Sequence, residues 1–185
     1  MVLLKTPAPD TTMKAPDFEL ESVDGKSYTY KDVAGKNGTV VMFICNHCPY
    51  VQGIVDRLPT EVKHLKKAGI GVVAIMPNDT ESHPEDDFEN MKKFAKEHKF
   101  NFPYLIDHTQ DVAKAYGAVC TPDFFGFDRK RNLVYRGRLD SAGHQKADPA
   151  TEPELRNAMI AIADDEGVLM MEQVSSMGCS IKWRE

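Results

Sequence analysis

The sequence predicts an α/β fold in which a mixed central sheet lies between layers of helices. Segments with strand patterns alternate along the chain with segments that have helix patterns, as expected when strands are joined through helices. The series closes with two neighbouring strand patterns, residues 123–128 and 133–139, around a basic turn. Such an antiparallel pair makes the sheet mixed rather than purely parallel. The chain contains no internal repeat or linker, so we expect one domain over residues 1–185.

The N-terminal part predicts two peripheral features and the first central strand. Residues 1–17 contain three prolines, which lack a backbone donor, so we expect an extended arm that lies over the body rather than inside a sheet. Asp24-Gly25 lies between short segments with a strand pattern and predicts an N-terminal hairpin. The apolar run at residues 39–44 has the pattern of a buried strand.

The remaining elements follow from apolar periodicity and from glycine and proline positions. Residues 51–67 have a helical pattern that Pro59 is expected to kink or split. Residues 164–185 have a less regular pattern and are expected to form a C-terminal tail. Between these two segments we expect a buried strand at 70–76, a helix at 84–98, a short strand at 103–106, a short helix at 111–116 and a last helix at 152–163.

The composition is that of a globular protein and limits the classes of partner. Hydrophobic residues make up 42% of the 185 residues and charged residues 28%, which is enough apolar material for a substantial core. The net charge is 23 − 28 = −5, which argues against nucleic acid or an anionic membrane as a partner. The first residues have too short an apolar segment for a secretory signal, so we expect a cytoplasmic location.

The most informative motif is Cys45-Asn46-His47-Cys48-Pro49-Tyr50, directly after the 39–44 strand. Two cysteines separated by two residues at the carboxyl end of a strand match the thiol–disulfide redox pattern. A helix that begins there would direct its N–H groups at the first sulfur and favour its thiolate. We therefore expect Cys45, the more exposed thiol, to attack an oxidised sulfur, and Cys48 to resolve the mixed disulfide.

The neighbours of the two cysteines support this interpretation without excluding others. Asn46 and His47 can stabilise a thiolate by hydrogen bonding or charge, and Pro49 suits the first turn of a helix. The alternatives are a pair of buried small residues and a zinc site that uses the other cysteines. Because Cys120 and Cys179 are single and far apart in the sequence, we expect redox chemistry with no metal and no cofactor.

Several motifs, taken in their order, resemble the redoxin branch of the thioredoxin superfamily, which includes the AhpC/TSA proteins. The resemblance covers about residues 13–183 and implies a thioredoxin-like three-layer sandwich, with Pro122 in the cis form beside the redox pair. It also implies a thiol–disulfide oxidoreductase that takes a protein or small-molecule disulfide and a thiol or thioredoxin-type electron donor. The motifs are Ala15–Leu20, Asp24–Lys26, Gly35-Lys36, Phe43–Val51, Thr121–Phe125, Tyr135–Asp140 and Gly178–Trp183.

A peroxiredoxin-like thiol peroxidase that acts on hydroperoxides is the second function that the resemblance allows. In the pattern Pro-x-x-x-Thr/Ser-x-x-Cys, with Cys48 as the cysteine, Val41 and Cys45 stand at the Pro and Thr positions. The peroxide-orienting arginine would fall near Thr121, so Arg136 or Arg138 would have to replace it. These departures favour disulfide over peroxide as the substrate.

The other polar residues give weaker signals. The buried aspartate of thioredoxins would map near Thr39, so another group or water must move the proton. Cys120, next to Thr121-Pro122, is expected to support the site as a packed thiol, a disulfide partner or a metal ligand. Cys179 is expected to be buried against the body, with pairing to another thiol as the alternative. We interpret Asn78-Asp79 as a loop cap, and residues 85–87 and the histidines other than His47 as exposed. A non-catalytic interaction module remains the alternative from another class.

Overall fold

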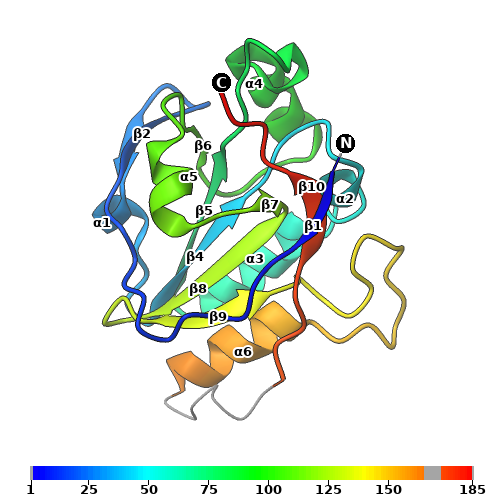
Figure 1. Ribbon diagram of the computed structural model, residues 1–185. Helices are drawn as coiled ribbons and strands as arrows, with labels where there is room; N and C mark the ends of the chain where they lie inside the picture. Colours follow the sequence, from blue (N-terminus) through cyan, green and yellow to red (C-terminus); the bar gives the residue numbers. More distant parts are fainter. Residues whose placement is uncertain (1, 165–171, 185) are drawn as a thin grey trace.

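The computed structural model describes residues 2–164 and 172–184, and Figure 1 shows its elements. The main sheet has seven strands in the spatial order β3-β2-β6-β5-β4-β8-β9. Its strands are β2 (Glu19–Ser22), β3 (Ser27–Thr29), β4 (Gly38–Phe43), β5 (Ile70–Met76), β6 (Tyr104–Ile106), β8 (Asp123–Asp128) and β9 (Leu133–Gly137). The helices are α1 (Tyr30–Val33), α2 (Pro49–Gln52), α3 (Leu58–Lys67), α4 (Phe88–Glu97), α5 (Asp111–Tyr116) and α6 (Glu154–Ala163), with a 3₁₀ turn η1 (Pro84–Asp86).

Strand β4 lies in the interior of the sheet, and all six of its residues are buried. It pairs in parallel with β5 and antiparallel with β8, so the sheet is mixed, as predicted. Its continuous apolar run is the pattern expected for a strand that is covered on both faces. The short hairpin of β2 and β3 forms one edge, with Gly25 in the left-handed region at φ +81° where glycine is favoured.

Alternate residues of β4 supply two separate apolar clusters, one on each face of the sheet. Val40 and Met42 pack with residues of α3, α4 and α6. Val41 and Phe43 pack with residues of α1 and α5 on the other face. This alternation follows from the two-residue repeat of a strand and gives the three-layer sandwich that the sequence predicted.

A second, three-stranded sheet corrects two predictions about the chain ends. It has the order β1-β10-β7, with β1 at Leu3–Lys5, β7 at Cys120–Thr121 and β10 at Met177–Ser180 (Figure 1). The N-terminal arm was predicted to stay outside any sheet, but Leu3–Lys5 precede the first proline and keep their backbone donors. The C-terminal tail was predicted to be less regular, yet it contains strand β10. This strand pairs with β1 from the N-terminal end of the chain and lies beside Cys48. Within that tail, residues 165–171 and 185 lie outside the described residues.

The predicted helix at 51–67 is divided, in agreement with the effect expected of Pro59. Helix α2 ends at Gln52 and α3 begins at Leu58, with Pro59 in its first turn, where the missing N–H costs no hydrogen bond. The predicted helix at 84–98 begins as η1, and Asp87 then caps α4 by accepting a hydrogen bond from Asn90 N. Among the described residues, no helix has the length and apolar character needed to cross a membrane.

Candidate active site

The two cysteines of the motif lie between the end of β4 and the start of α2. Cys48, rather than Cys45, is the N-cap residue of α2, although its side chain makes no capping hydrogen bond. Both thiols are fully buried, with 0% exposure. The prediction that Cys45 is the exposed thiol at the helix N-terminus is therefore wrong. Three residues separate Cys45 from the first residue of α2, and Cys45 continues the buried end of the strand.

Cys48 is the thiol whose surroundings favour the anion. Interaction with the protonated Cys45 thiol lowers the pKa of Cys48 to about 5; burial opposes this shift, and the Cys179 thiol adds to it. The Cys179 Sγ lies 2.9 Å from the Cys48 Sγ. When protonated, Cys48 donates to the Thr121 carbonyl oxygen at 3.1 Å. A thiol with such a pKa is a thiolate at neutral pH, which is the form that attacks disulfides.

Cys45 has the opposite electrostatic character. Burial raises the pKa of the Cys45 thiol. Its hydrogen bond with Cys48 and the negative charge of Asp86 raise this pKa further. Its Sγ lies 3.2 Å from the Thr121 hydroxyl oxygen. The Cys45 Sγ, a His47 ring nitrogen and an Asp86 carboxylate oxygen lie within 4.8 Å of one another. Cys45 therefore stays protonated beside a group that can take its proton.

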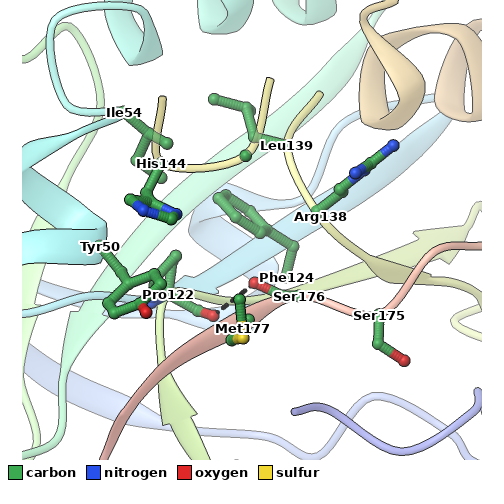
Figure 2. A pocket seen from close by; sticks show the side chains of 11 residues that line it. Tyr50, Ile54, Pro122, Phe124, Arg138, Leu139, His144, Ser175, Ser176 and Met177 are labelled. Atoms are coloured by element: carbon green, nitrogen blue, oxygen red, sulfur yellow. Dashed lines mark hydrogen bonds between the residues drawn. The ribbon is translucent and has the colours of Figure 1, made fainter. Parts of the chain in front are cut away.

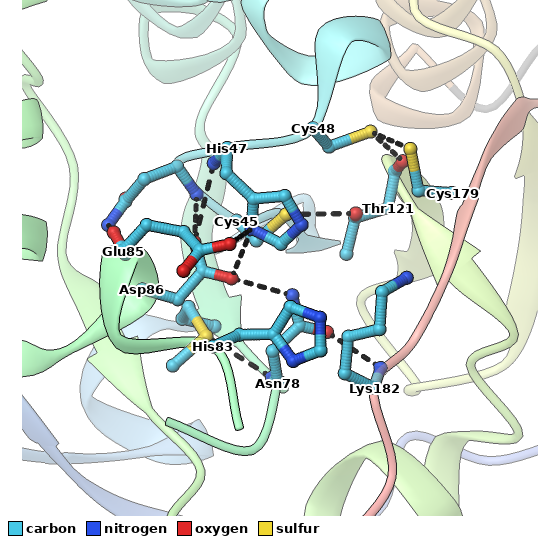
Figure 3. A network of polar contacts seen from close by, with 12 residues as sticks. Cys45, His47, Cys48, Asn78, His83, Glu85, Asp86, Thr121, Cys179 and Lys182 are labelled. Atoms are coloured by element: carbon cyan, nitrogen blue, oxygen red, sulfur yellow. Dashed lines mark hydrogen bonds and ion pairs between the residues drawn. The ribbon is translucent and has the colours of Figure 1, made fainter. Parts of the chain in front are cut away.

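Asp86 is the site residue that sequence reasoning missed. Residues 85–87 were interpreted as exposed, but Asp86 is fully buried at the end of η1. Its Oδ1 accepts hydrogen bonds from the Asn46 N–H at 2.8 Å and the His47 N–H at 3.3 Å. Burial raises the pKa of this carboxyl, but its hydrogen bonds outweigh burial and leave the pKa below the ordinary value. The carboxylate thus fixes the backbone between the two cysteines (Figure 3).

His47 and Asn46 are held in place by this carboxylate and its neighbours. The His47 Nδ1 lies 2.7 Å from Asp86 Oδ2, and this hydrogen bond raises the pKa of His47. The His47 ring also stacks on His83, with ring centroids 5.4 Å apart, so His83 belongs to the site although it was predicted to be a surface residue. The Asn46 side chain donates to the Glu85 carbonyl oxygen and accepts from the Tyr104 hydroxyl.

Asn78 links the carboxylate to the C-terminal segment. Its amide donates to Asp86 Oδ2 at 2.8 Å, and its carbonyl oxygen accepts from the Lys182 N–H at 3.0 Å. Asp79 instead accepts hydrogen bonds from Ser82 in the following turn, the capping role expected for this pair. Asn78 is therefore a site residue, because it connects the loop after β5 both to Asp86 and to the segment that follows β10.

The loop between β7 and β8 completes the site. The Thr121–Pro122 peptide bond is cis, and Thr121 contacts both cysteines of the pair through its hydroxyl and its carbonyl oxygen. Cys120, which was expected to support the site, is a fully buried thiol whose Sγ lies 3.6 Å from the Pro122 carbonyl oxygen. Burial raises the pKa of Cys120. Pro49 occupies the first position of α2, as expected.

The two arginines considered for peroxide binding are both paired with carboxylates. Arg136 donates to Asp123 at 2.9 Å and to the Gly117 carbonyl oxygen at 2.8 Å. Arg138 makes a two-point contact with Glu154, at 2.6 and 2.8 Å. Each guanidinium therefore already has a carboxylate partner that fixes its orientation. Among the contacts given for the described residues, neither arginine has a hydrogen bond to Cys48.

Two groups of possible metal ligands occur among the described residues. One combines Cys45, His47 and Asp86, and the other combines His47, His83 and Glu85. Each group offers three donors, whereas structural zinc is almost always held by four. Both use His47, whose Nδ1 already hydrogen-bonds Asp86. This arrangement fits a hydrogen-bonded proton carrier better than a structural zinc site.

A small pocket lies against the cis proline (Figure 2). Its volume is about 100 Å³, and Pro122, Phe124 and Leu139 give it an apolar wall. Tyr50, which follows the motif proline, lines one side of the pocket. Its ring centroid lies 4.4 Å from the ring centroid of His144. The Ser176 hydroxyl donates to the Pro122 carbonyl oxygen at 2.8 Å. The pocket has the size of one side chain or small organic group.

Comparison with known proteins places this geometry in a family. The model of the AhpC/TSA family matches residues 11–136. A crystal structure of an uncharacterized conserved protein from Geobacillus kaustophilus is 43% identical, with a TM-score of 0.93 over 100% of this chain and 97% of that chain. The thiol-disulfide oxidoreductase ResA of Bacillus subtilis is 27% identical over 65% of this chain and 63% of its own length. Peroxiredoxin Q of Populus jackii is 29% identical over 60% of this chain and 47% of its own length. The chain therefore spans less than two thirds of these two curated relatives.

Proposed function

We propose that this chain, which belongs to the AhpC/TSA family within the redoxin branch of the thioredoxin superfamily, is a thiol–disulfide oxidoreductase with Cys48 as the nucleophile. The observation that carries this proposal is the opposite electrostatic character of the two motif thiols. Cys48 has a pKa lowered to about 5, and the pKa of Cys45 lies well above its ordinary value. This reverses the order of attack that the sequence suggested.

In the first step, the Cys48 thiolate attacks one sulfur of a substrate disulfide. A Cys48–substrate disulfide forms, and the other substrate sulfur leaves as a thiolate. Cys48 thereby loses the negative charge that helped to raise the pKa of Cys45. The same step thus prepares Cys45 to become the second nucleophile.

In the second step, Cys45 attacks the Cys48 sulfur of the mixed disulfide. Its proton passes to the His47–Asp86 pair, whose ring nitrogen and carboxylate oxygen lie within 4.8 Å of the Cys45 Sγ. The second substrate sulfur leaves as a thiolate and takes up a proton. The products are one substrate thiolate, one substrate thiol and a Cys45–Cys48 disulfide. Asp86 thereby takes the place of the buried aspartate that the sequence lacks near Thr39.

The partners follow from the same chemistry. The pocket against Pro122 accommodates one side chain or a group of similar size, which suits a small-molecule disulfide or one residue of a protein substrate. A thiol or thioredoxin-type donor would return the Cys45–Cys48 disulfide to the dithiol by the reverse exchange.

A direct comparison of two oxidants tests this proposal. We expect the reduced protein to reduce a small aromatic disulfide at a rate well above its reaction with hydrogen peroxide, because Arg136 and Arg138 are each already paired with a carboxylate. The measurement is stopped-flow loss of protein thiols with each oxidant at neutral pH. Faster thiol loss with peroxide than with the disulfide would replace this function by the peroxidase alternative, which the family and the thiolate at Cys48 also favour.

A further inference from the structure

The chain covers its own redox pair with a strand from its C-terminal segment. Strand β10 pairs antiparallel with β7, so that Cys179 is opposite Thr121 and Ser180 is opposite Cys120. Addition of a strand to an open strand edge is a common way in which proteins bind extended peptides. Here the added strand comes from the same chain, and it presents a cysteine at the position opposite Thr121.

This strand brings the Cys179 thiol onto Cys48. The two Sγ atoms are 2.9 Å apart, and both residues are buried (Figure 3). A disulfide bond is about 2.05 Å long, so a small movement would join them. By contrast, Cys120 lies in β7 opposite Ser180 and directs its thiol at the Pro122 carbonyl oxygen.

The residue before Cys179 makes this close approach possible. A Cβ atom at Gly178 would lie 2.0 Å from the Thr121 carbonyl oxygen, so a larger residue would push β10 away from β7. The strand is also fixed on both sides of Cys179. Ser176 donates to the Pro122 carbonyl oxygen, and the Lys182 N–H donates to Asn78 of the Asp86 network.

We propose that Cys179 is a third redox thiol of this site, which resolves the mixed disulfide on Cys48 in competition with Cys45. This inference rests on the proposed function, because it requires the Cys48–substrate disulfide. The Cys179 thiolate attacks the Cys48 sulfur, the Cys48–Cys179 bond forms, and the bond from Cys48 to the substrate sulfur breaks. The substrate sulfur leaves as a thiolate and takes up the proton that Cys179 released. Two protein thiols are oxidised, and one substrate disulfide is reduced.

The electrostatics around Cys179 change in the direction that this step needs. Burial raises the pKa of Cys179 to about 12, and the neighbouring Cys48 adds to the increase. The contribution of Cys48 ends when its sulfur enters a mixed disulfide. The positive charge of Lys182, which lowers the pKa of Cys179, remains. Attack by Cys179 is therefore favoured only after Cys48 has reacted.

The test removes Cys45 and compares two matched double variants. Cys45→Ser/Cys120→Ser retains Cys179, and Cys45→Ser/Cys179→Ser retains Cys120. Each reduced protein receives one equivalent of 5,5′-dithiobis(2-nitrobenzoate), and the release of the coloured thiolate is followed by absorbance. We expect both equivalents of thiolate from the first variant, with a Cys48–Cys179 disulfide in the peptide map. The second variant should release one equivalent and retain the adduct on Cys48.

The outcomes separate this inference from the function on which it rests. Stable adducts on Cys48 in both variants would overturn the role of Cys179 and leave the proposed function intact. Release of both equivalents from both variants would also overturn it, because Cys179 would then be unnecessary. The first equivalent reports that Cys48 is folded and reactive in each variant. No release from these variants or from the unaltered protein would overturn the proposed function together with this inference.

Discussion

Cys48→Ser is expected to lower the rate of disulfide reduction by about 10³-fold or more, since it removes the atom that forms the mixed disulfide. The rate is measured with a small aromatic disulfide under steady-state conditions, with dithiothreitol as the electron donor. The matched control is Cys120→Ser, which makes the same change at another fully buried thiol and should leave the rate within a small factor. A Cys48→Ser protein with the rate of the control would contradict the proposed nucleophile.

Asp86→Asn is expected to slow the resolving step by about 10²-fold, within the range typical of general acid–base groups. Asparagine retains an acceptor oxygen for the Asn46 and His47 backbone N–H groups, but it cannot carry the Cys45 proton. We would measure it in a Cys179→Ser background, so that Cys45 is the resolving thiol of the proposed mechanism. In this background the first equivalent of reporter thiolate reports attack by Cys48, and the second reports resolution of the mixed disulfide by Cys45.

The two steps give this experiment its internal control. The first equivalent should be released at a rate similar to that of Cys179→Ser alone, because Cys48 is already ionised at neutral pH. Selective loss of the second equivalent is the outcome that a folding defect would not give. Equal slowing of both equivalents would assign Asp86 a structural role only, through the backbone that it holds.

The parts of the fold and site that the sequence predicted are those encoded by neighbouring residues. The fully apolar run of β4 predicts a strand covered on both faces, and the cysteine spacing predicts a redox pair at its end. Pro59 similarly predicts the division between α2 and α3. In each case the local pattern has a direct physical consequence that does not depend on distant contacts.

The features that the sequence did not predict depend on contacts between distant segments. Asp86 lies about 40 positions along the chain from Asn46 and His47, whose backbone N–H groups donate hydrogen bonds to it. It is the packing of η1 against the motif that buries this acidic residue, which the local sequence pattern marks as exposed. Strand β10 is short and irregular in pattern, and its pairing with β1 and β7 joins segments from opposite ends of the chain. The assignment of Cys45 as the nucleophile was wrong for the same reason, because Asp86 and Cys179 are part of what separates the pKa values of the two thiols.

The most direct test of the central claim is the pH dependence of alkylation, with the alkylated residue identified by peptide mass mapping. The reduced protein is treated briefly with iodoacetamide at a series of pH values. With a Cys48 pKa of about 5, the label should fall first on Cys48, and its rate should rise up to about pH 6 and then stay level. First labelling of Cys45, or a rate at Cys48 that keeps rising through about pH 8.5 as for an ordinary thiol, would contradict the account.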